Sequence, residues 1–563
     1  MKKKIPIGVS DFKKVIEDNY YFVDKSLFIK EIVEDGSEVI LLPRPRRFGK
    51  TLNMSMLKYL YEKSEEDNRH LFEGLKINNY EDIMTMQGKY PVIYITFKDE
   101  KHSKWERCKD GFEGIVINEF SRHDYILEGD ALKEYEKKKV MQILEGTAPY
   151  STYLNGLKIL SQYLYKFHKQ KVVILIDEYD VPIQSGYMHG YYDEVIEFMR
   201  IFLSGGLKDN TYLEKSVLTG ILRVAKESIF SGMNNLKVST LISSHYNSSF
   251  GFLEDEMQDM LKYYGIEYET KEVQNWYNGY RFGDKTIYNP WSILNYVDNY
   301  REGFKPYWVN TSSNDLVKRV LAKGGEILKM ELEDLVEGKE IEKEINENIV
   351  MHDINAESNN AWSFLLFSGY LKVVDKKIER ARTYCKLKIP NLEVKYLYED
   401  IILAWFRENI SGEKFNVMLK SLVTGDIKIF SKIFREFILN SVSYFDVSGK
   451  ESEKVYHSFV LGALIALSDE YQVKSNRESG YGRYDIMIIP RDINKKGIVI
   501  EFKKVDKDDN ETLEKCAQNA LNQIEDRNYK RELLDRGVKD VIELGIAFEG
   551  KKSMIVTSWK CSR

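Results

Sequence analysis

Cysteine is scarce in this sequence, and the few cysteines are scattered. The 563 residues contain four, Cys108, Cys385, Cys516 and Cys561, and no two of them form a CxxC pair. Structural zinc sites and disulfide frameworks need cysteines at close or regular spacing. The pattern therefore disfavours both and indicates a reducing compartment.

Long apolar runs are missing as well. The longest run beside a helical pattern, Phe459–Leu467, is far shorter than the about 20 residues that a membrane-spanning helix needs. The N-terminal MKKKIPIG lacks the apolar core of a signal peptide. We therefore expect a cytoplasmic protein without a membrane segment.

Charge and composition do not single out a class of function. A net charge of −5 gives no indication of a nucleic-acid binder, and 43% hydrophobic with 30% charged residues is typical of a globular protein. The length predicts about three to four domains. No repeat or low-complexity linker separates them, so changes of pattern place the boundaries: residues 1–265, 266–445 and 446–563.

A phosphate-binding loop is the first motif that carries chemistry. The apolar run Val39–Leu42 leads into PRPRRFGKTLNMSML, which predicts a buried strand, a tight loop ending in Gly-Lys-Thr, and a helix. Gly49 lets the backbone approach a ligand, Lys50 can reach the β- and γ-phosphates of ATP, and the Thr51 hydroxyl can ligate Mg²⁺.

The loop departs from the general pattern G-x-x-x-x-G-K-[ST], which requires glycine where this chain has Arg44. Pro45 stiffens the loop, and Arg46 and Arg47 add positive charge beside the phosphates. Taken alone, Gly-Lys-Thr leaves a basic turn before a helix as the alternative interpretation.

A second motif supports nucleotide binding. Val172–Ile176 is a continuous apolar run of the kind buried in a parallel sheet, and Asp177 and Glu178 follow it. Ligands of open α/β folds bind at this end of the strands. Asp177 would belong to the Mg²⁺ shell and Glu178 would orient or deprotonate the attacking water. The alternative is an Asp-Glu pair that only ends a strand and caps a helix.

A further apolar strand, Ser216–Leu222, offers two polar sensors for the γ-phosphate. Thr219 lies within it and Arg223 directly follows it. Threonine is common in strands for reasons of propensity alone, so the structural interpretation of Thr219 stays open.

Several segments together resemble the AAA-ATPase-like family, a prokaryotic group of P-loop ATPases similar to archaeal and STAND-type ATPases. They are RPRRFGKTL, VILIDEYD, TGILRVAKESIFSGMNNL, FGFLEDEM, WYNGYRFG and IYNPWSILNY, between about Ile5 and Tyr296. The resemblance implies that arginine in place of the first loop glycine is usual. It also implies an inserted strand between the strands of the two motifs. Four residues carry over, namely Lys50, Thr51, Asp177 and Glu178, and no residue matches an arginine finger.

Residues 266–445 are expected to be mainly helical, forming a lid and a connecting domain, with a winged-helix type as one option. No motif of nameable chemistry occurs in this part. Its aromatic residues are more typical of core packing than of base stacking.

A pair of strands near the C-terminus carries the third motif. Arg483–Pro490 and Gly497–Lys504 are joined by a polar turn. Glu501 and Lys503 share one face of their strand, and an antiparallel hairpin would bring Asp485 opposite them. Asp485 and Glu501 would bind Mg²⁺, with Mn²⁺ as an alternative, and Lys503 would position water or stabilise charge on phosphorus. The alternative is a solvated face of alternating charges.

This D-x₁₅-E-F-K pattern resembles the PD-(D/E)XK nuclease superfamily, with Tyr484 in place of the proline. The preceding helix, Glu453–Leu467, and the following helix with Gln523 and Tyr529 extend the resemblance over about Glu453–Thr557. Glu453 or Glu478 is a candidate additional metal ligand. From Asp446 onwards the chain has 21 basic and 21 acidic residues, so a DNA-binding face would need local clusters. Those clusters are Lys503-Lys504 and the group Arg527, Lys530 and Arg531.

The sequence thus predicts an α/β protein with a P-loop ATPase domain containing a parallel sheet, a helical connecting region and a restriction-endonuclease-like domain. We expect ATP hydrolysis coupled to Mg²⁺-dependent cleavage of nucleic acid, DNA rather than RNA, with defence against foreign DNA as a role by analogy. The alternative is a nucleotide-gated switch whose nuclease-like domain binds DNA or protein without cutting. A homo-oligomer is compatible with the sequence, and the trigger stays open.

Overall fold

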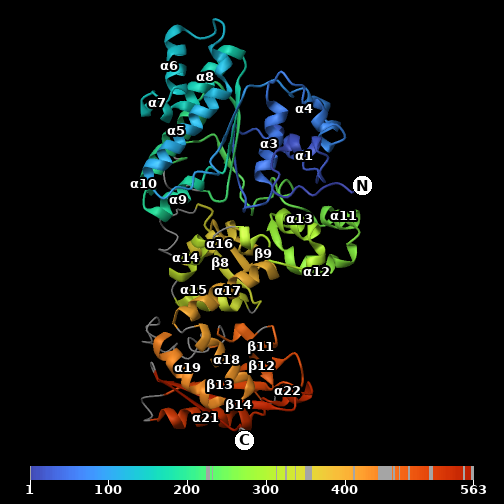
Figure 1. Ribbon diagram of the computed structural model, residues 1–563, viewed down its shortest axis with the longest axis vertical. Helices are drawn as coiled ribbons and strands as arrows, with labels where there is room; N and C mark the ends of the chain where they lie inside the picture. The colour runs from blue at the N-terminus through green and yellow to red at the C-terminus, as the bar shows by residue number, and fades with distance from the viewer. Residues whose placement is uncertain are drawn as a thin grey trace. The chain divides into compact units, whose positions relative to one another are not determined.

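A parallel sheet of five strands forms the centre of the N-terminal part in the computed structural model (Figure 1). The strands lie in the order β2 (Val92–Thr96), β3 (Val172–Asp177), β4 (Leu213–Gly220), β1 (Val39–Pro43) and β5 (Leu236–Val238). The strand β4 separates β1 from β3, which confirms the inserted strand. The carboxyl ends of β1 and β3, where both motifs lie, therefore share one edge of the sheet.

The structure describes residues 2–223, 229–230, 233–311, 314–323, 326–336, 338–348, 358–409, 412–441, 460, 463–467, 469–479, 482–505, 511–549 and 552–559. The chain divides into two compact units, residues 1–323 with 340–394, and residues 324–339 with 395–563. Each unit groups residues that contact one another, and its limits need not be domain boundaries. The three-part division at 265 and 445 therefore stays a prediction. Within the described ranges, no helix is long and apolar enough to cross a membrane.

Helices cover both faces of the parallel sheet. Figure 1 shows α5, α6, α7, α8 and α10 on one side and α1, α3 and α4 on the other. Their bounds are α1 Phe12–Glu17, α2 Leu27–Glu34, α3 Lys50–Tyr61, α4 Glu81–Met84, α5 Trp105–Arg122, α6 Glu134–Leu144, α7 Tyr150–Leu154, α8 Gly156–His168, α9 Val181–His189 and α10 Tyr192–Leu207. Burial on both faces explains why β1 and β3 are continuously apolar instead of alternating.

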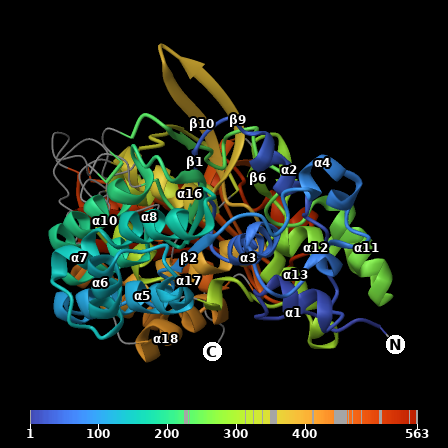
Figure 2. The ribbon, with the colours of Figure 1, turned by 90° about the horizontal axis from the view of Figure 1, so that it is seen from above.

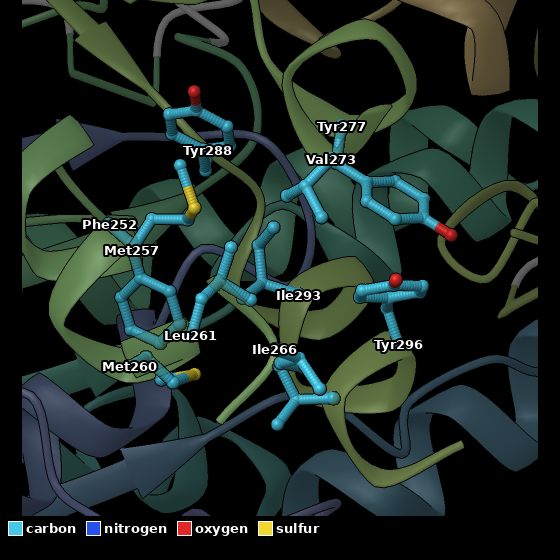
Figure 3. Packing of buried hydrophobic residues seen from close by; sticks show 11 residues of the cluster. Phe252, Met257, Met260, Leu261, Ile266, Val273, Tyr277, Tyr288, Ile293 and Tyr296 are labelled. Carbon is cyan, nitrogen blue, oxygen red and sulfur yellow. The ribbon is translucent and has the colours of Figure 1, made fainter. Parts of the chain in front are cut away.

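A small helical body follows the sheet, made of α11 (Glu254–Tyr264), α12 (Thr270–Tyr277) and α13 (Pro290–Asp298). Figure 3 shows buried side chains of these helices and their connections converging on one cluster, which includes Met257, Leu261, Val273, Ile293 and Tyr296. Asn289 caps α13, since its side chain accepts a hydrogen bond from the Ser292 N–H at 3.2 Å, and Pro290 occupies the first turn. The cluster and the cap together fix the start of α13.

Residues 266–445 are mainly helical, as expected, but they also contain strands. The hairpin of β6 (Tyr280–Phe282) and β7 (Lys285–Ile287) precedes α13. An antiparallel sheet has the order β8 (Ile341–Glu344), β10 (Arg382–Lys388), β9 (Lys372–Glu379). Figure 2 shows the β9–β10 hairpin extending away from its neighbours in the first unit. The winged-helix option stays a prediction, because residues 349–357 between β8 and α16 lie outside the described ranges. The helices here are α14 Asp315–Lys323, α15 Glu326–Val336, α16 Ser358–Phe367, α17 Leu392–Asn409, α18 Gly412–Thr424 and α19 Ile427–Ser441.

The second unit contains a mixed sheet in the order β11 (Tyr471–Ser479), β12 (Gly482–Pro490), β13 (Gly497–Lys504), β14 (Val541–Glu549) and β15 (Lys552–Thr557). Only β13 and β14 run parallel, joined by a crossover through α21 (Leu513–Asp526) and α22 (Arg531–Asp535). The β12–β13 hairpin is antiparallel, as the sequence predicts. Most of the expected helix Glu453–Leu467 lies outside the described residues.

Gly545 lets α21 approach this sheet closely. It pairs with Glu501 across β13 and β14. A Cβ at Gly545 would lie 2.3 Å from the Ala517 carbonyl oxygen and 2.5 Å from the Leu521 nitrogen, both backbone atoms of α21. The helix can therefore rest at this distance only over a residue without a side chain.

We predict that Gly545→Ala destabilises the second unit by roughly 1–3 kcal/mol, because the helix backbone must move away from the sheet. Gly412→Ala is the matched control, since a Cβ there meets no atom within 4 Å. Urea unfolding followed by circular dichroism measures both variants. Equal unfolding midpoints for Gly545→Ala and wild type would show that α21 does not rest on Gly545.

Candidate functional site

The loop between β1 and α3 contains two residues in the left-handed backbone conformation. Gly49 has φ 87° and directly precedes α3, and Arg47 has φ 67°. Both angles lie in the left-handed region, which glycine adopts without strain and arginine does not. Phe48, between them, is fully buried. The turn thus directs the N-terminal N–H groups of α3 toward the carboxyl edge of the sheet.

Lys50 is the first residue of α3, and its almost fully buried side chain reaches back to the loop backbone. Its ammonium donates hydrogen bonds to the carbonyl oxygens of Arg44 at 3.0 Å and Pro45 at 2.9 Å. Burial lowers the pKa of Lys50, and the nearby carboxylates of Glu178 and Asp177 oppose that shift. A phosphate bound by Lys50 would compete with the two loop carbonyls.

Asp177 connects the two nucleotide motifs. Its carboxylate accepts a hydrogen bond from Thr51 Oγ1 at 2.7 Å and another from Thr219 Oγ1. Burial raises the pKa of Asp177, and the hydrogen bond from Thr219 opposes the shift. Asp177 and Thr51 thus place two oxygen atoms together, which is the ligand type that Mg²⁺ prefers.

Thr219 also accepts a long hydrogen bond from the Glu178 N–H, at 3.4 Å. Its hydroxyl therefore contacts the residues of the second motif, a geometry that holds Asp177 in place. Glu178 has φ 53°, a left-handed conformation at the exit of β3. The sensor role of Thr219 and the catalytic role of Glu178 both stay predictions.

The third motif is assembled by the β12–β13 hairpin. The register pairs Ile486 with Ile500, so one further step along the hairpin brings Asp485 opposite Glu501. The Asp485 carboxylate accepts a hydrogen bond from the Phe502 N–H at 2.7 Å. Glu501 is buried, with 4% of its surface exposed, and Lys503 lies two residues farther on and half-buried. Strand parity therefore places the three predicted residues on one face.

A residue of α21 completes this site, and spacing alone does not identify it. The Gln523 amide donates hydrogen bonds to Glu501 Oε1 and, at 3.3 Å, to the Tyr529 hydroxyl. Burial raises the pKa of Tyr529, while its hydrogen bond with Gln523 opposes the shift. The available sequence signal was the resemblance, which included both residues.

Among the described residues no group of three His, Cys, Asp or Glu side chains could hold a metal ion. Glu453 lies outside the described residues, as does the side chain of Glu478.

Comparison with known proteins identifies two domains in the chain. Residues 6–230 match the family model described as a predicted AAA-ATPase, and residues 451–558 match the PD-(D/E)XK nuclease superfamily. The chain joins an AAA-ATPase-like domain to a PD-(D/E)XK superfamily domain. Both resemblances seen in the sequence are thereby confirmed.

Two individual proteins are also similar to this chain. An uncharacterized protein in the vnfD 5′ region of Azotobacter chroococcum mcd 1 is 25% identical over 570 residues, which is 99% of this chain and 98% of the relative. The structure of the Aeropyrum pernix ORC2 protein in ADPNP–ADP complexes matches 67% of this chain and 92% of its own, at 10% identity and a TM-score of 0.24. A score that low supports no conclusion about the fold.

Arg44 explains how the AAA-ATPase-like domain tolerates the missing loop glycine. The side chain is fully buried. Its guanidinium donates to the carbonyl oxygens of Ser239 at 2.6 Å and Tyr246 at 3.2 Å, and burial lowers its pKa to about 9. Arg44 thus fastens the loop to the segment after β5.

Asp180, three residues after Asp177, is a buried acid of the AAA-ATPase-like domain to which the sequence pattern assigns no role. Its Oδ2 accepts hydrogen bonds from the backbone N–H groups of Ile221 at 2.9 Å and Leu222 at 3.0 Å. These bonds fix the chain where β4 ends, directly before Arg223. The Nε of Arg223 is buried without a hydrogen bond to any described residue. Its sensor role stays a prediction.

Two tryptophans hold the arginines of the loop. The Arg47 guanidinium lies 4.2 Å from the centre of the Trp291 ring, and the Trp308 indole N–H donates to the Arg46 carbonyl oxygen at 3.0 Å. The Arg46 side chain donates to Gln184 Oε1 at 3.2 Å. Arg46 and Arg47 thus have protein partners, and their predicted contact with phosphates stays a prediction.

A buried glutamate bonds to Trp308 and to the residue that follows Trp291. Glu393 has no exposed surface, and its carboxylate accepts hydrogen bonds from Ser292 Oγ at 2.8 Å and from the Trp308 backbone N–H. Ser292 directly follows Trp291 in α13. Burial raises the pKa of Glu393 to about 7, and the hydrogen bond from Ser292 opposes the shift.

The basic group expected beside the PD-(D/E)XK site is largely paired with acids. Lys530 lies 3.2 Å from Glu543 Oε1, and Arg531 lies 3.2 Å from Asp535 Oδ1. The Glu543 side chain is buried, whereas the pair of Arg531 and Asp535 is exposed and contributes little to stability. Both pairs reduce the positive charge available to a phosphate backbone. Of the two clusters, Lys503-Lys504 is the one next to the acids.

We predict that Glu393 makes stability depend on pH. Its ordinary pKa is 4.5 and its folded pKa is about 7, so only the folded protein keeps the proton between these values. Stability is therefore full below the unfolded pKa and falls as pH rises through this window, by on the order of 3 kcal/mol. Above the folded pKa it stays constant.

Urea unfolding of wild type and Glu393→Gln across this window measures the effect. Glutamine can accept from the Trp308 N–H and donate to Ser292 Oγ without a titratable charge, so the variant should lack this part of the decline. Identical pH dependence of the two proteins would contradict the raised pKa.

Proposed function

We propose that this protein binds and hydrolyses ATP in its AAA-ATPase-like domain and cuts nucleic acid, DNA rather than RNA, in its PD-(D/E)XK domain. The observation that carries the proposal is that each domain brings its predicted polar residues together, in the first domain from segments far apart in the chain and in the second from one hairpin. Lys50, Thr51 and Asp177 meet at one edge of the parallel sheet, while Asp485, Glu501 and Lys503 share one face of the second unit.

In the ATPase site, the N-terminus of α3 and Lys50 would bind the β- and γ-phosphates. The oxygens of Thr51 and Asp177 fit Mg²⁺, which would neutralise phosphate charge when bound. Thr219 holds the Asp177 carboxylate in place. Glu178, at the exit of β3, would take a proton from the attacking water.

In the nuclease site, the Asp485 and Glu501 carboxylates are oxygen ligands that fit Mg²⁺ or Mn²⁺. A bound ion would polarise the scissile phosphate. Gln523 orients Glu501 through its hydrogen bond, and Asp485 is oriented by the Phe502 N–H. Lys503 would position the water or stabilise charge on phosphorus.

The alternative function is a nucleotide-gated switch whose second domain binds DNA or protein without cutting. It is favoured by the ion pairs of Lys530 with Glu543 and of Arg531 with Asp535, which leave less positive charge near the acids to bind the nucleic acid that cutting requires. A cytoplasmic location, a role in defence against foreign DNA and homo-oligomerisation remain further proposals without a structural observation of their own.

We predict that Lys50→Ala loses ATP binding and that Glu178→Gln keeps binding but loses hydrolysis. Lys50 contacts the phosphates, whereas the Glu178 charge is needed only for the water. Removing a positioned general base typically slows the reaction by about 10²–10⁴-fold. Calorimetry measures binding and single-turnover assays measure hydrolysis. Wild-type turnover by Lys50→Ala would refute the loop assignment.

We also predict that Asp485→Ala and Glu501→Ala abolish metal-dependent cleavage without changing ATP binding, because each removes half of the carboxylate pair. Glu525→Ala, an exposed acid on α21, is the control. Wild type and variants are incubated with linear, circular and single-stranded DNA, and with RNA, in Mg²⁺ or Mn²⁺. Undiminished cleavage by Glu501→Ala would refute the site, and intact DNA with wild type would favour the switch.

A further inference from the structure

The backbone of the nucleotide loop is held from outside at two adjacent positions. Trp308 donates its indole N–H to the Arg46 carbonyl oxygen, and Trp291 stacks on the Arg47 guanidinium. The turn before β9 touches the same loop, since a Cβ at Gly369 would lie 2.9 Å from the Pro45 Cβ. A movement of the loop backbone must therefore move these contacts as well.

ATP binding is expected to cause such a movement. The Lys50 ammonium donates hydrogen bonds to the carbonyl oxygens of Arg44 and Pro45, the two residues directly before Arg46, whose carbonyl bonds to Trp308. Phosphates that draw Lys50 away leave both carbonyls to find other donors. The most direct response is a rotation of peptide groups between Arg44 and Arg46, and the Arg46 carbonyl lies at the end of this segment.

Glu393 is the residue connected to both tryptophans, directly to Trp308 and through Ser292 to Trp291. It accepts the backbone N–H of Trp308 and the hydroxyl of Ser292, the neighbour of Trp291. Tyr277 and Tyr307 are the titratable groups that act on it electrostatically, and neither offers a positive charge. Glu393 forms no ion pair with any residue in the described ranges. A buried carboxylate in this situation depends on its hydrogen bonds, so its position follows the donors.

Glu393 also belongs to the first turn of α17. The preceding Asn391 anchors that turn, because its side chain accepts from the Val394 N–H at 3.1 Å and donates to the Asn278 carbonyl at 2.9 Å. The helix runs from Leu392 to Asn409, and the first compact unit ends at Val394. One continuous helix thus begins beside the nucleotide loop and continues into the unit that contains the PD-(D/E)XK domain.

We propose that Glu393 is a positioning residue that transmits ATP binding from the nucleotide loop, through Trp308 and Ser292, to α17. The inference rests on the proposed ATP binding. It adds the route by which the effect of that binding is transmitted to the second unit. Glu393 touches no nucleotide. It acts by bonding the start of α17 to Trp308 and Ser292, and Trp308 and the neighbour of Ser292, Trp291, contact the loop.

Hydrogen exchange of the α17 amides in the full-length protein, with and without a non-hydrolysable ATP analogue, tests this route. Wild type should bind the analogue and change its exchange in α17. Glu393→Ala should bind it within about twofold of wild type yet lose the α17 response, while Glu393→Gln restores the response. Trp308→Phe should weaken binding about fivefold, the equivalent of one hydrogen bond, and also lose the response.

Glu136→Gln is the matched control, a buried glutamate of α6 bonded to Lys166 that should leave the α17 response intact. Ser292→Ala, which removes a single hydroxyl, replaces Glu393→Ala if the latter fails to fold, and should diminish the response. An unchanged α17 response in Glu393→Ala or Ser292→Ala overturns the inference, as does wild type that binds the analogue without any response. Wild type that binds no analogue overturns the proposed ATPase function itself and the route with it.

Discussion

The hydrogen bonds of the Asp177 carboxylate tie the AAA-ATPase-like domain together. A buried carboxylate needs donors, and this one takes them from Thr51 on α3 and Thr219 on β4. Three elements that are far apart in the chain therefore meet at one functional group. Moving α3 or β4 would remove one of the two donors from the buried acid, so the geometry of the site and the packing of the sheet constrain each other.

The same principle shapes the PD-(D/E)XK domain with different parts. Glu501 is oriented by an amide of α21, and α21 can reach it because Gly545 presents no side chain. Asp485 is oriented by a backbone N–H of the neighbouring strand. In both domains the acids lie on strands, and a side chain from a helix that packs over the sheet hydrogen-bonds to one of them. This support holds the acids rigidly.

Much of this arrangement could be predicted from the sequence because the signals are local. The apolar runs before Lys50 and Asp177 predicted two buried strands of one parallel sheet, and strand parity placed Glu501 and Lys503 on one face. The partners of those residues could not be predicted the same way. Gln523 reaches Glu501 from a helix whose distance depends on Gly545, and nothing in the spacing of either residue encodes that approach.

The middle of the chain was harder for a related reason. The strands β9 and β10 pair with each other across the turn at Arg380 and Ala381. Most of β9 is exposed and charged, so its sequence lacks the alternation of apolar and polar residues that predicts a strand. Glu393 resembles any first-turn glutamate in sequence. Its burial arises from Trp308 and Ser292, which are 85 and 101 residues away.

Arg44 has a consequence for how such proteins are recognised. The general loop pattern lists residues, but what the loop requires is a stable path for its backbone, and here a buried guanidinium provides it by bonding to Ser239 and Tyr246. Restoring the customary glycine would remove those bonds and open a hole between the rings of Phe250 and Phe282. A search that insists on the glycine would thus pass over chains whose loops are secured from the rest of the domain.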